Sequence, residues 1–244
     1  MRNIWTVYKR ELLAFFNSPV AYVIIIAFLL LSGAFAFGFG FLLEAGDASL
    51  AEAFFVWHPW FFVVLAPAVG MRQWADENRL GTIELLLTMP VKPWQAILGK
   101  YFAACTVWLI AIALTFPIWW TVNYLGDPDN GTIFAGYIGS FLVCATCLAI
   151  TTAISASTRN QVVCLIVSVV VCLALAVVGF EPLVRLLSKS LEPSTVSFIT
   201  SFGFFTHFTD ITRGVLVLRD IVYFLSIIVA CLIATSAILR ASRA

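Results

Sequence analysis

The sequence predicts an all-α integral membrane protein with six membrane-spanning helices. Of its 244 residues, 62% are hydrophobic and 11% are charged, and the mean hydropathy is +1.02. Soluble domains contain roughly 45–50% apolar and about 25% charged residues, so this composition excludes an ordinary water-soluble fold. Because a spanning helix needs about 20 apolar residues, the chain has room for six spans but not for a separate soluble domain. We expect a single transmembrane domain over residues 1–244.

The first expected element is an amphipathic helix that lies in the membrane interface, over residues 2–16. Trp5, Tyr8, Leu12 and Phe15 recur at helical spacing on one side, and the basic residues lie largely on the other side. This distribution is typical of a helix that rests on the bilayer surface rather than crossing it.

Six apolar runs of spanning length follow this helix. We expect them at about residues 20–43, 54–71, 101–124, 132–156, 161–180 and 221–239. Pro59 and Pro67 lie in the second run, and each removes a backbone donor, so we expect that helix to be kinked. Residues 181–220 form a long connection whose apolar piece, 196–208, is too short to cross, and we expect a re-entrant outer segment there.

The distribution of basic residues predicts the orientation of the chain. Ten of the 14 Lys and Arg residues lie in the N-terminal segment, residues 72–100, the turn at 159 and the C-terminus, and the other four lie in residues 181–220. Cytoplasmic segments of membrane proteins retain Lys and Arg. Both termini are therefore expected in the cytoplasm.

The chain carries no motif that indicates catalysis. It contains no GxSxG, HExxH or GxxxxGK[ST] sequence, and we predict no catalytic residue, no metal site and no bound cofactor. Cys144 and Cys147 have metal-ligand spacing, but they lie within a predicted span and are interpreted as small buried residues. His58 is interpreted as an interfacial histidine rather than a proton relay. The net charge of +1 gives no indication of a nucleic-acid partner.

Residues 77–91, between the second and third predicted spans, are the most informative stretch. They read Glu-Asn-Arg-Leu-Gly-Thr-Ile-Glu-Leu-Leu-Leu-Thr-Met-Pro-Val, and Gly99-Lys100 open the next span. A short leucine-rich helix with a proline stop makes a rigid knob that can transmit motion between a soluble partner and the spans. The alternative is an interfacial helix that only covers the bundle.

This pattern resembles the ABC-2 class of exporter permeases, in which the corresponding segment is a coupling helix seated in a groove of an ATPase. The resemblance implies a permease subunit that forms a translocation path in the bacterial inner membrane. It implies two copies of a separate ATPase subunit that binds ATP and Mg, and a second permease, either another copy of this chain or a related one. The coupling residues are then expected to be Glu77, Arg79, Gly81, Thr82, Glu84, Leu85, Leu86, Met89 and Pro90.

Residues 207–226 carry a second pattern, His-Phe, then Arg-Gly-Val, Leu-Arg-Asp and Tyr-Phe-Leu-Ser, before the last span. It resembles permeases of the gliding-motility and nitrous-oxide-reductase-maturation type, which implies an accessory membrane protein with a periplasmic part. The outer gate segment is expected to contain His207, Phe208, Asp210, Arg213, Gly214, Arg219 and Asp220. Because charges at an apolar edge need partners, we expect Asp210, Arg213, Arg219 and Asp220 to pair locally. The alternative is that the two arginines anchor to lipid headgroups.

A membrane channel, or a scaffold subunit of an envelope complex without ATP-driven transport, is the alternative function. The predicted centres of spans three to six carry almost no ionisable residue. An ion or proton pathway usually needs such residues at membrane depth, so the sequence favours the permease.

Overall fold

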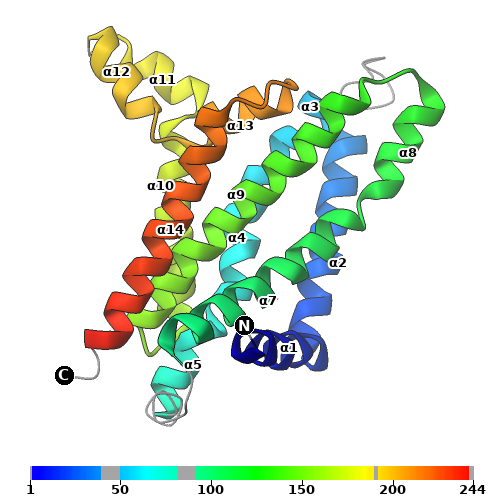
Figure 1. The fold of residues 1–244 in the computed structure, drawn as a ribbon. Coiled ribbons are helices and arrows are strands. Elements are labelled where there is room, and N and C mark those ends of the chain that lie inside the picture. Colours follow the sequence, from blue (N-terminus) through cyan, green and yellow to red (C-terminus); the bar gives the residue numbers. More distant parts are fainter. Residues whose placement is uncertain (1, 40–49, 82–91, 190–191, 242–244) are drawn as a thin grey trace.

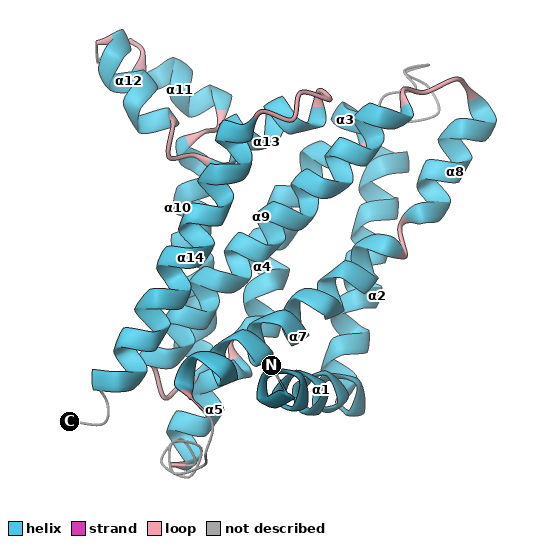
Figure 2. Ribbon diagram, viewed as in Figure 1, coloured by secondary structure: helices cyan, strands magenta, loops and turns pink. Residues whose placement is uncertain are grey.

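The computed structural model describes residues 2–39, 50–81, 92–189 and 192–241, and these residues form helices joined by short loops (Figures 1 and 2). The α-helices are α1 (Arg2–Asn17), α2 (Pro19–Ala34), α3 (Leu50–Ala53), α4 (His58–Gly70), α5 (Arg72–Leu80), α7 (Pro93–Ala113), α8 (Phe116–Leu125), α9 (Asn130–Ser157), α10 (Gln161–Val178), α11 (Glu181–Leu187), α12 (Pro193–Thr200), α13 (Phe204–Thr212) and α14 (Leu218–Ala241). A π-helix, η1 (Phe35–Phe39), continues α2, and a 3-10 turn, η2 (Phe55–Trp57), precedes α4.

Helix α9 is the centre of the bundle, and α4, α7, α10, α13 and α14 all pack against it. Its most apolar stretch is 72% buried, whereas the corresponding stretches of the other candidate spans are 17% to 44% buried. Small residues on α9 allow this close packing. At Gly139, for example, an added Cβ would lie 2.8 Å from Ile211 Cγ2 of α13.

Five helical stretches within the described residues are long and apolar enough to cross a membrane, which makes the chain a membrane protein. They are Pro19–Gly38, Pro93–Leu125, Asn130–Ser157, Gln161–Val178 and Leu218–Ala241. The span predicted at 54–71 is not among them, because α4 has only 13 residues. It begins after the η2 turn and contains Pro67. A helix of that length measures about 20 Å, less than the roughly 30 Å of a bilayer core.

The third predicted span, 101–124, begins earlier in the structure and is broken. Helix α7 starts at Pro93, and the chain bends at Leu114 and Thr115 before α8. Pro117 lies in the first turn of α8. An N–H at this position would have no partner within the helix, so proline costs no helical hydrogen bond there. The Thr115 hydroxyl donates to the Ile112 carbonyl oxygen at 2.6 Å, which satisfies one acceptor at the break.

The two ends of the bundle differ in architecture. Helices α1 and α5 and the end of α14 lie at one end, and α3, α11, α12 and α13 lie at the opposite end (Figure 1). We call these the α5 end and the α13 end. The apolar piece predicted at 196–208 is divided between α12 and α13 by a turn at Ser201–Gly203, and one face of α13 is buried against α9.

Candidate functional site

The structure describes only part of the predicted coupling segment. Glu77 and Arg79 lie on α5, and Gly81 ends α5 with a φ of +69°, a conformation that glycine adopts without strain. The other predicted coupling residues lie outside the described residues: Thr82, Glu84, Leu85, Leu86, Met89 and Pro90. The described part of the site is therefore α5, the helix that leads directly into them.

Helix α5 begins at a bend after α4, and Ser155 of α9 stabilises this bend. The Ser155 hydroxyl accepts hydrogen bonds from the backbone N–H groups of Trp74 at 3.1 Å and Ala75 at 3.0 Å. It donates to the Met71 carbonyl oxygen at 2.9 Å. The first N–H groups of a helix have no partner within the helix, so Ser155 acts as an N-terminal cap supplied by another helix.

The rest of α5 is bound to the turn between α9 and α10. The Asn78 amide donates to the carbonyl oxygens of Ala156 at 3.0 Å and Thr158 at 3.2 Å, where α9 ends and its last carbonyls lack helical donors. Gln161, at the start of α10, donates a hydrogen bond from its side-chain amide to the Asp76 carboxylate of α5. These bonds fix α5 to both helices of the turn.

Trp74 anchors α5 by packing. Its side chain is 1% exposed and lies in a small cluster with Ala96 and Ile97 of α7, Ala156 of α9 and Leu239 of α14. Burial of a large aromatic side chain is among the strongest packing contributions available to a helix. Through Trp74, α5 contacts the ends of three spans.

Lys100 of α7 joins α5 to α1. Its side chain is 3% exposed, and the ammonium lies 2.8 Å from Glu77 Oε1 of α5 and 3.3 Å from Glu11 Oε1 of α1. It also lies 5.2 Å from the centre of the Trp74 ring, a cation–π distance. A buried ammonium is tolerated only when opposite charges replace water, and two carboxylates do so here. We call Trp74, Glu77, Asn78, Lys100 and Ser155 the α5 anchor.

Helix α1 is held against α7 beside Lys100. An added Cβ at Gly99 would lie 2.8 Å from Val7 Cγ1, so glycine is what permits the two helices to approach this closely. Burial alone would raise the pKa of Glu11, but the Lys100 ammonium and the Arg10 guanidinium outweigh it and lower that pKa below the ordinary value of 4.5. Glu11 is therefore ionised at neutral pH.

Sequence reasoning missed most of the α5 anchor. Glu77 was predicted, but Lys100 and Ser155 were not, and neither was Glu11, the second partner of Lys100, because each lies in a different predicted element. Gly99-Lys100 appeared only as the opening of a span. The available signal was a lysine placed within an apolar helix, which needs a carboxylate partner from elsewhere in the fold.

At the α13 end, His207 and Asp220 form a buried pair. His207 Nδ1 lies 2.6 Å from Asp220 Oδ1, and each side chain is 3% exposed. His207 Nε2 lies 2.9 Å from the Ser201 carbonyl oxygen, which can only accept, so Nε2 carries a hydrogen. The Tyr223 ring stacks on the imidazole with ring centres 4.0 Å apart. This hydrogen-bonded pair links α13 to the start of α14.

The other predicted gate residues are arranged differently from the expectation. Asp220 pairs with His207 rather than with an arginine, and Asp210, Arg213 and Arg219 are exposed and form no ion pair with any described residue. The expected local pairing of these four charges was therefore wrong. Phe208 is buried against α9, and Gly214 has a φ of +84° where the chain turns toward α14.

The remaining candidate residues lie in the core. His58 is fully buried, and its Nδ1 lies 2.7 Å from the Ser140 hydroxyl of α9, so the interfacial interpretation was wrong. Cys144 and Cys147 are both buried in α9, as predicted. Across the described ranges, no three His, Cys, Asp or Glu side chains are grouped as metal ligands.

Comparison with known proteins assigns the chain to a family. The family described as ABC-2 family transporter protein matches residues 5–244. Comparison with curated proteins gives no match. Because the family match extends over nearly the whole chain, the protein belongs to the ABC-2 family of transporter membrane proteins.

Proposed function

We propose that this protein is the permease subunit of an ATP-binding cassette exporter-type complex and is driven by a separate ATPase. Residues 82–91 would sit in a groove of that ATPase, with Glu84 and the run of leucines at 85–87 in direct contact. The observation that carries the proposal is the α5 anchor: the helix that leads into residues 82–91 is bonded to α7 and α9 and, through Lys100, to α1.

The α5 anchor provides a route for motion. A displacement of residues 82–91 by the ATPase would act on α5 as a rigid lever, because both halves of α5 are hydrogen bonded to α9. Trp74 would transmit the displacement to α7 and α14, and Glu77 would transmit it to Lys100. Packed elements of this kind move as units rather than deforming continuously.

Transport would need a second permease, either another copy of this chain or a related one, and two ATPase subunits. ATP binding would close the ATPase pair and shift the spans of the two permeases against each other, which opens the path at the α13 end. The α13 and α14 helices, joined by His207 and Asp220, would form the outer gate. The narrower resemblance to gliding-motility and nitrous-oxide-reductase-maturation permeases adds an accessory membrane protein to this proposal.

We place the complex in the bacterial inner membrane with both termini in the cytoplasm. This orientation rests on the excess of Lys and Arg at the α5 end. It requires six crossings, and η2 and α4 together would provide the sixth.

The test is co-purification of the chain with its ATPase, together with the ATPase rate of the complex. We expect Glu84→Arg and Leu86→Asp to abolish association or to reduce the membrane-stimulated rate to that of the ATPase alone. Asp127→Arg is the matched control, because Asp127 is an exposed acid at the opposite end of the bundle. If no ATPase associates, or if the coupling variants behave like the control, the channel or scaffold function replaces this proposal.

A further inference from the structure

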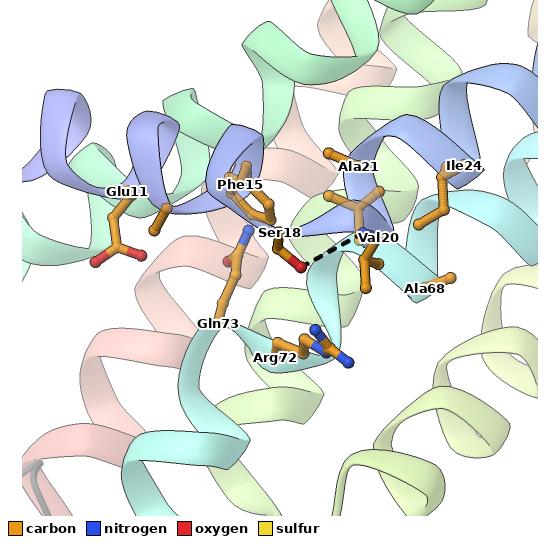
Figure 3. Close-up of a pocket in the computed structure, with 11 residues that line it drawn as sticks. Glu11, Phe15, Ser18, Val20, Ala21, Ile24, Ala68, Arg72 and Gln73 are labelled. Atoms are coloured by element: carbon orange, nitrogen blue, oxygen red, sulfur yellow. Dashed lines mark hydrogen bonds between the residues drawn. The ribbon is translucent and has the colours of Figure 1, made fainter.

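A pocket of about 140 Å³ lies between α1, α2, α4 and α5, next to the α5 anchor (Figure 3). Most of its wall is apolar and comes from Phe15, Val20, Ala21, Ile24, Ala68 and Val69. Its polar lining residues are Glu11, Ser18, Arg72 and Gln73. The pocket is therefore amphipathic, with hydrocarbon on one part of its wall and hydrogen-bonding groups on another.

Gln73 presents an unused donor to this pocket. The side chain is 4% exposed, and its Oε1 lies 2.9 Å from the Thr152 hydroxyl, whose one hydrogen it shares with the Leu148 carbonyl oxygen at 2.7 Å. Its Nε2 has no partner among the described residues. Figure 3 shows the amide reaching from α5 toward Phe15 and Ser18 at the pocket wall. A buried N–H without a partner is unfavourable, so the site favours a ligand that supplies an acceptor.

Arg72 supplies the positive charge in the polar part of the pocket. It lies next to Gln73 at the start of α5, is exposed, and forms no ion pair within the described part of the chain. The acid of the pocket is already neutralised, because the Glu11 carboxylate is bound to Arg10 at 2.7 Å and to Lys100 at 3.3 Å. The polar part of the pocket therefore carries an uncompensated positive charge and an amide donor, which together match a phosphate or phosphodiester.

The apolar wall selects a hydrocarbon chain. Ala21, Ile24 and Val69 are each at most 8% exposed, and apolar surface of this kind favours contact with hydrocarbon over contact with water. A volume of 140 Å³ accommodates part of one acyl chain and not a whole lipid. The remainder of such a lipid would lie in the bilayer, along the exposed side chains of α2 such as Val23 and Ile26.

We propose that this pocket binds one anionic glycerophospholipid from the leaflet at the α5 end. Its phosphate accepts hydrogen bonds from Arg72 and Gln73, and one acyl chain lies against Ile24, Ala68 and Val69. A bound lipid would bridge α1, α2 and the bend between α4 and α5, and so would stabilise the position of the α5 anchor. The site does not depend on the ATPase contact proposed above.

The experiment uses the full chain, purified in detergent without an ATPase, and native mass spectrometry with added phosphatidylglycerol or phosphatidylcholine. We expect the wild type to retain one phosphatidylglycerol in preference to phosphatidylcholine. Arg72→Gln should weaken phosphatidylglycerol binding about tenfold, as expected for loss of a hydrogen bond between charged groups. Ala68→Trp should abolish it by filling the pocket.

Matched controls separate this site from the rest of the lipid-facing surface. Arg159→Gln removes another exposed arginine at the α5 end, and Val229→Trp enlarges an exposed side chain of α14, a helix that does not line the pocket. Both should bind like the wild type. Equal retention of the two lipids, or equal loss in the variants and their controls, would overturn the proposal.

A second measurement keeps the proposal testable if Ala68→Trp does not fold. Phosphatidylglycerol with a diazirine in one acyl chain is photo-crosslinked to the wild type, and the labelled peptides are identified. Labels on residues 20–24 and 68–69 support the site, and labels confined to other helices exclude it. Neither measurement contains ATP or an ATPase, so its failure would leave the permease function standing.

Discussion

At the scale of single residues, Lys100 is the most constrained charge in the described structure. Its ammonium is almost fully removed from solvent and is balanced by Glu11 and Glu77, which are 18% and 20% exposed. Replacing water around a buried ammonium is costly, and the cost is recovered only while both carboxylates stay in place. The positions of α1, α5 and α7 are therefore tied together by one side chain.

Lys100→Met should lower the free energy of unfolding by about 3 kcal/mol, the lower end of the range for breaking a buried ion pair, because the two remaining carboxylates can reach water. Thermal unfolding in detergent measures this change. Lys9→Met is the control, since Lys9 is exposed on α1, and it should change stability by no more than about 0.5 kcal/mol. Equal stability of the two variants would show that Lys100 is not paired as described.

Glu11 makes the attachment of α1 sensitive to acid. Its pKa is lower in the folded protein than its ordinary value of 4.5, so its contribution to stability is present above pH 4.5 and is lost as the pH falls toward the folded pKa. Glu11→Gln should be less stable than the wild type at pH 7, and the difference should shrink as the pH falls from about 5 to about 3, a window that begins about two units below neutrality. Melting temperatures across this range test the prediction, with the exposed Glu192→Gln as control; a constant difference would contradict it.

At the scale of elements, the bend between α4 and α5 decides where the coupling segment begins. A continuous helix through Met71 would carry α5 straight on from α4, but the helix is broken there. Ser155 provides the hydrogen bonds that the backbone groups at the break would otherwise lack. The same principle acts at the α13 end, where the His207–Asp220 pair holds α13 against α14. In both places a side chain from one helix provides the hydrogen-bond partner that a group on another helix needs.

Ser155→Ala should destabilise α5, because two backbone N–H groups and one carbonyl lose their partner at a cost of about 1–3 kcal/mol. Hydrogen exchange should show faster exchange of the Trp74 and Ala75 amides in this variant. Ser157→Ala is the matched control, since the exposed Ser157 hydroxyl bonds only to the Ile154 carbonyl within its own helix. Unchanged exchange at Trp74 and Ala75 would mean that the bend does not depend on Ser155.

At the scale of the whole molecule, the bundle places α1, α5 and the end of α14 together, and α11 to α13 at the opposite end (Figure 1). Five stretches of the described chain meet the length and hydropathy of a span, and α4 does not. A short helix buried among longer ones can still cross when its ends are covered by protein rather than by lipid. Helix α4 meets this condition, because it packs against α2, α9 and α10.

The number of crossings can be measured with topology reporters fused to each terminus. Six crossings place both termini on the same side, and we expect both reporters to be active in the cytoplasm, with a third reporter at Asp127 on the other side. Five crossings would place the two termini on opposite sides and would contradict the proposed orientation. A reporter inserted after Gly81 checks that α5 lies on the side of the termini.

Composition and periodicity by themselves determined that this is a helical membrane protein whose first residues form an amphipathic helix. The boundaries of the longest described helix also came close, since residues 132–156 were predicted and α9 runs from Asn130 to Ser157. Hydrophobic runs and turn residues are local signals, so they can be interpreted without knowing which helices meet. The stretch at 77–91 likewise indicated the family from its own residues.

Only the tertiary structure decided which distant residues meet. Lys100 with Glu11 and Glu77, Ser155 with the start of α5, and His207 with Asp220 all join residues from different helices. The pocket at Gln73 is likewise formed by four separate elements. Spacing along the chain says which side of a helix a residue occupies but not which helix faces it, because that choice is made by packing of the whole bundle.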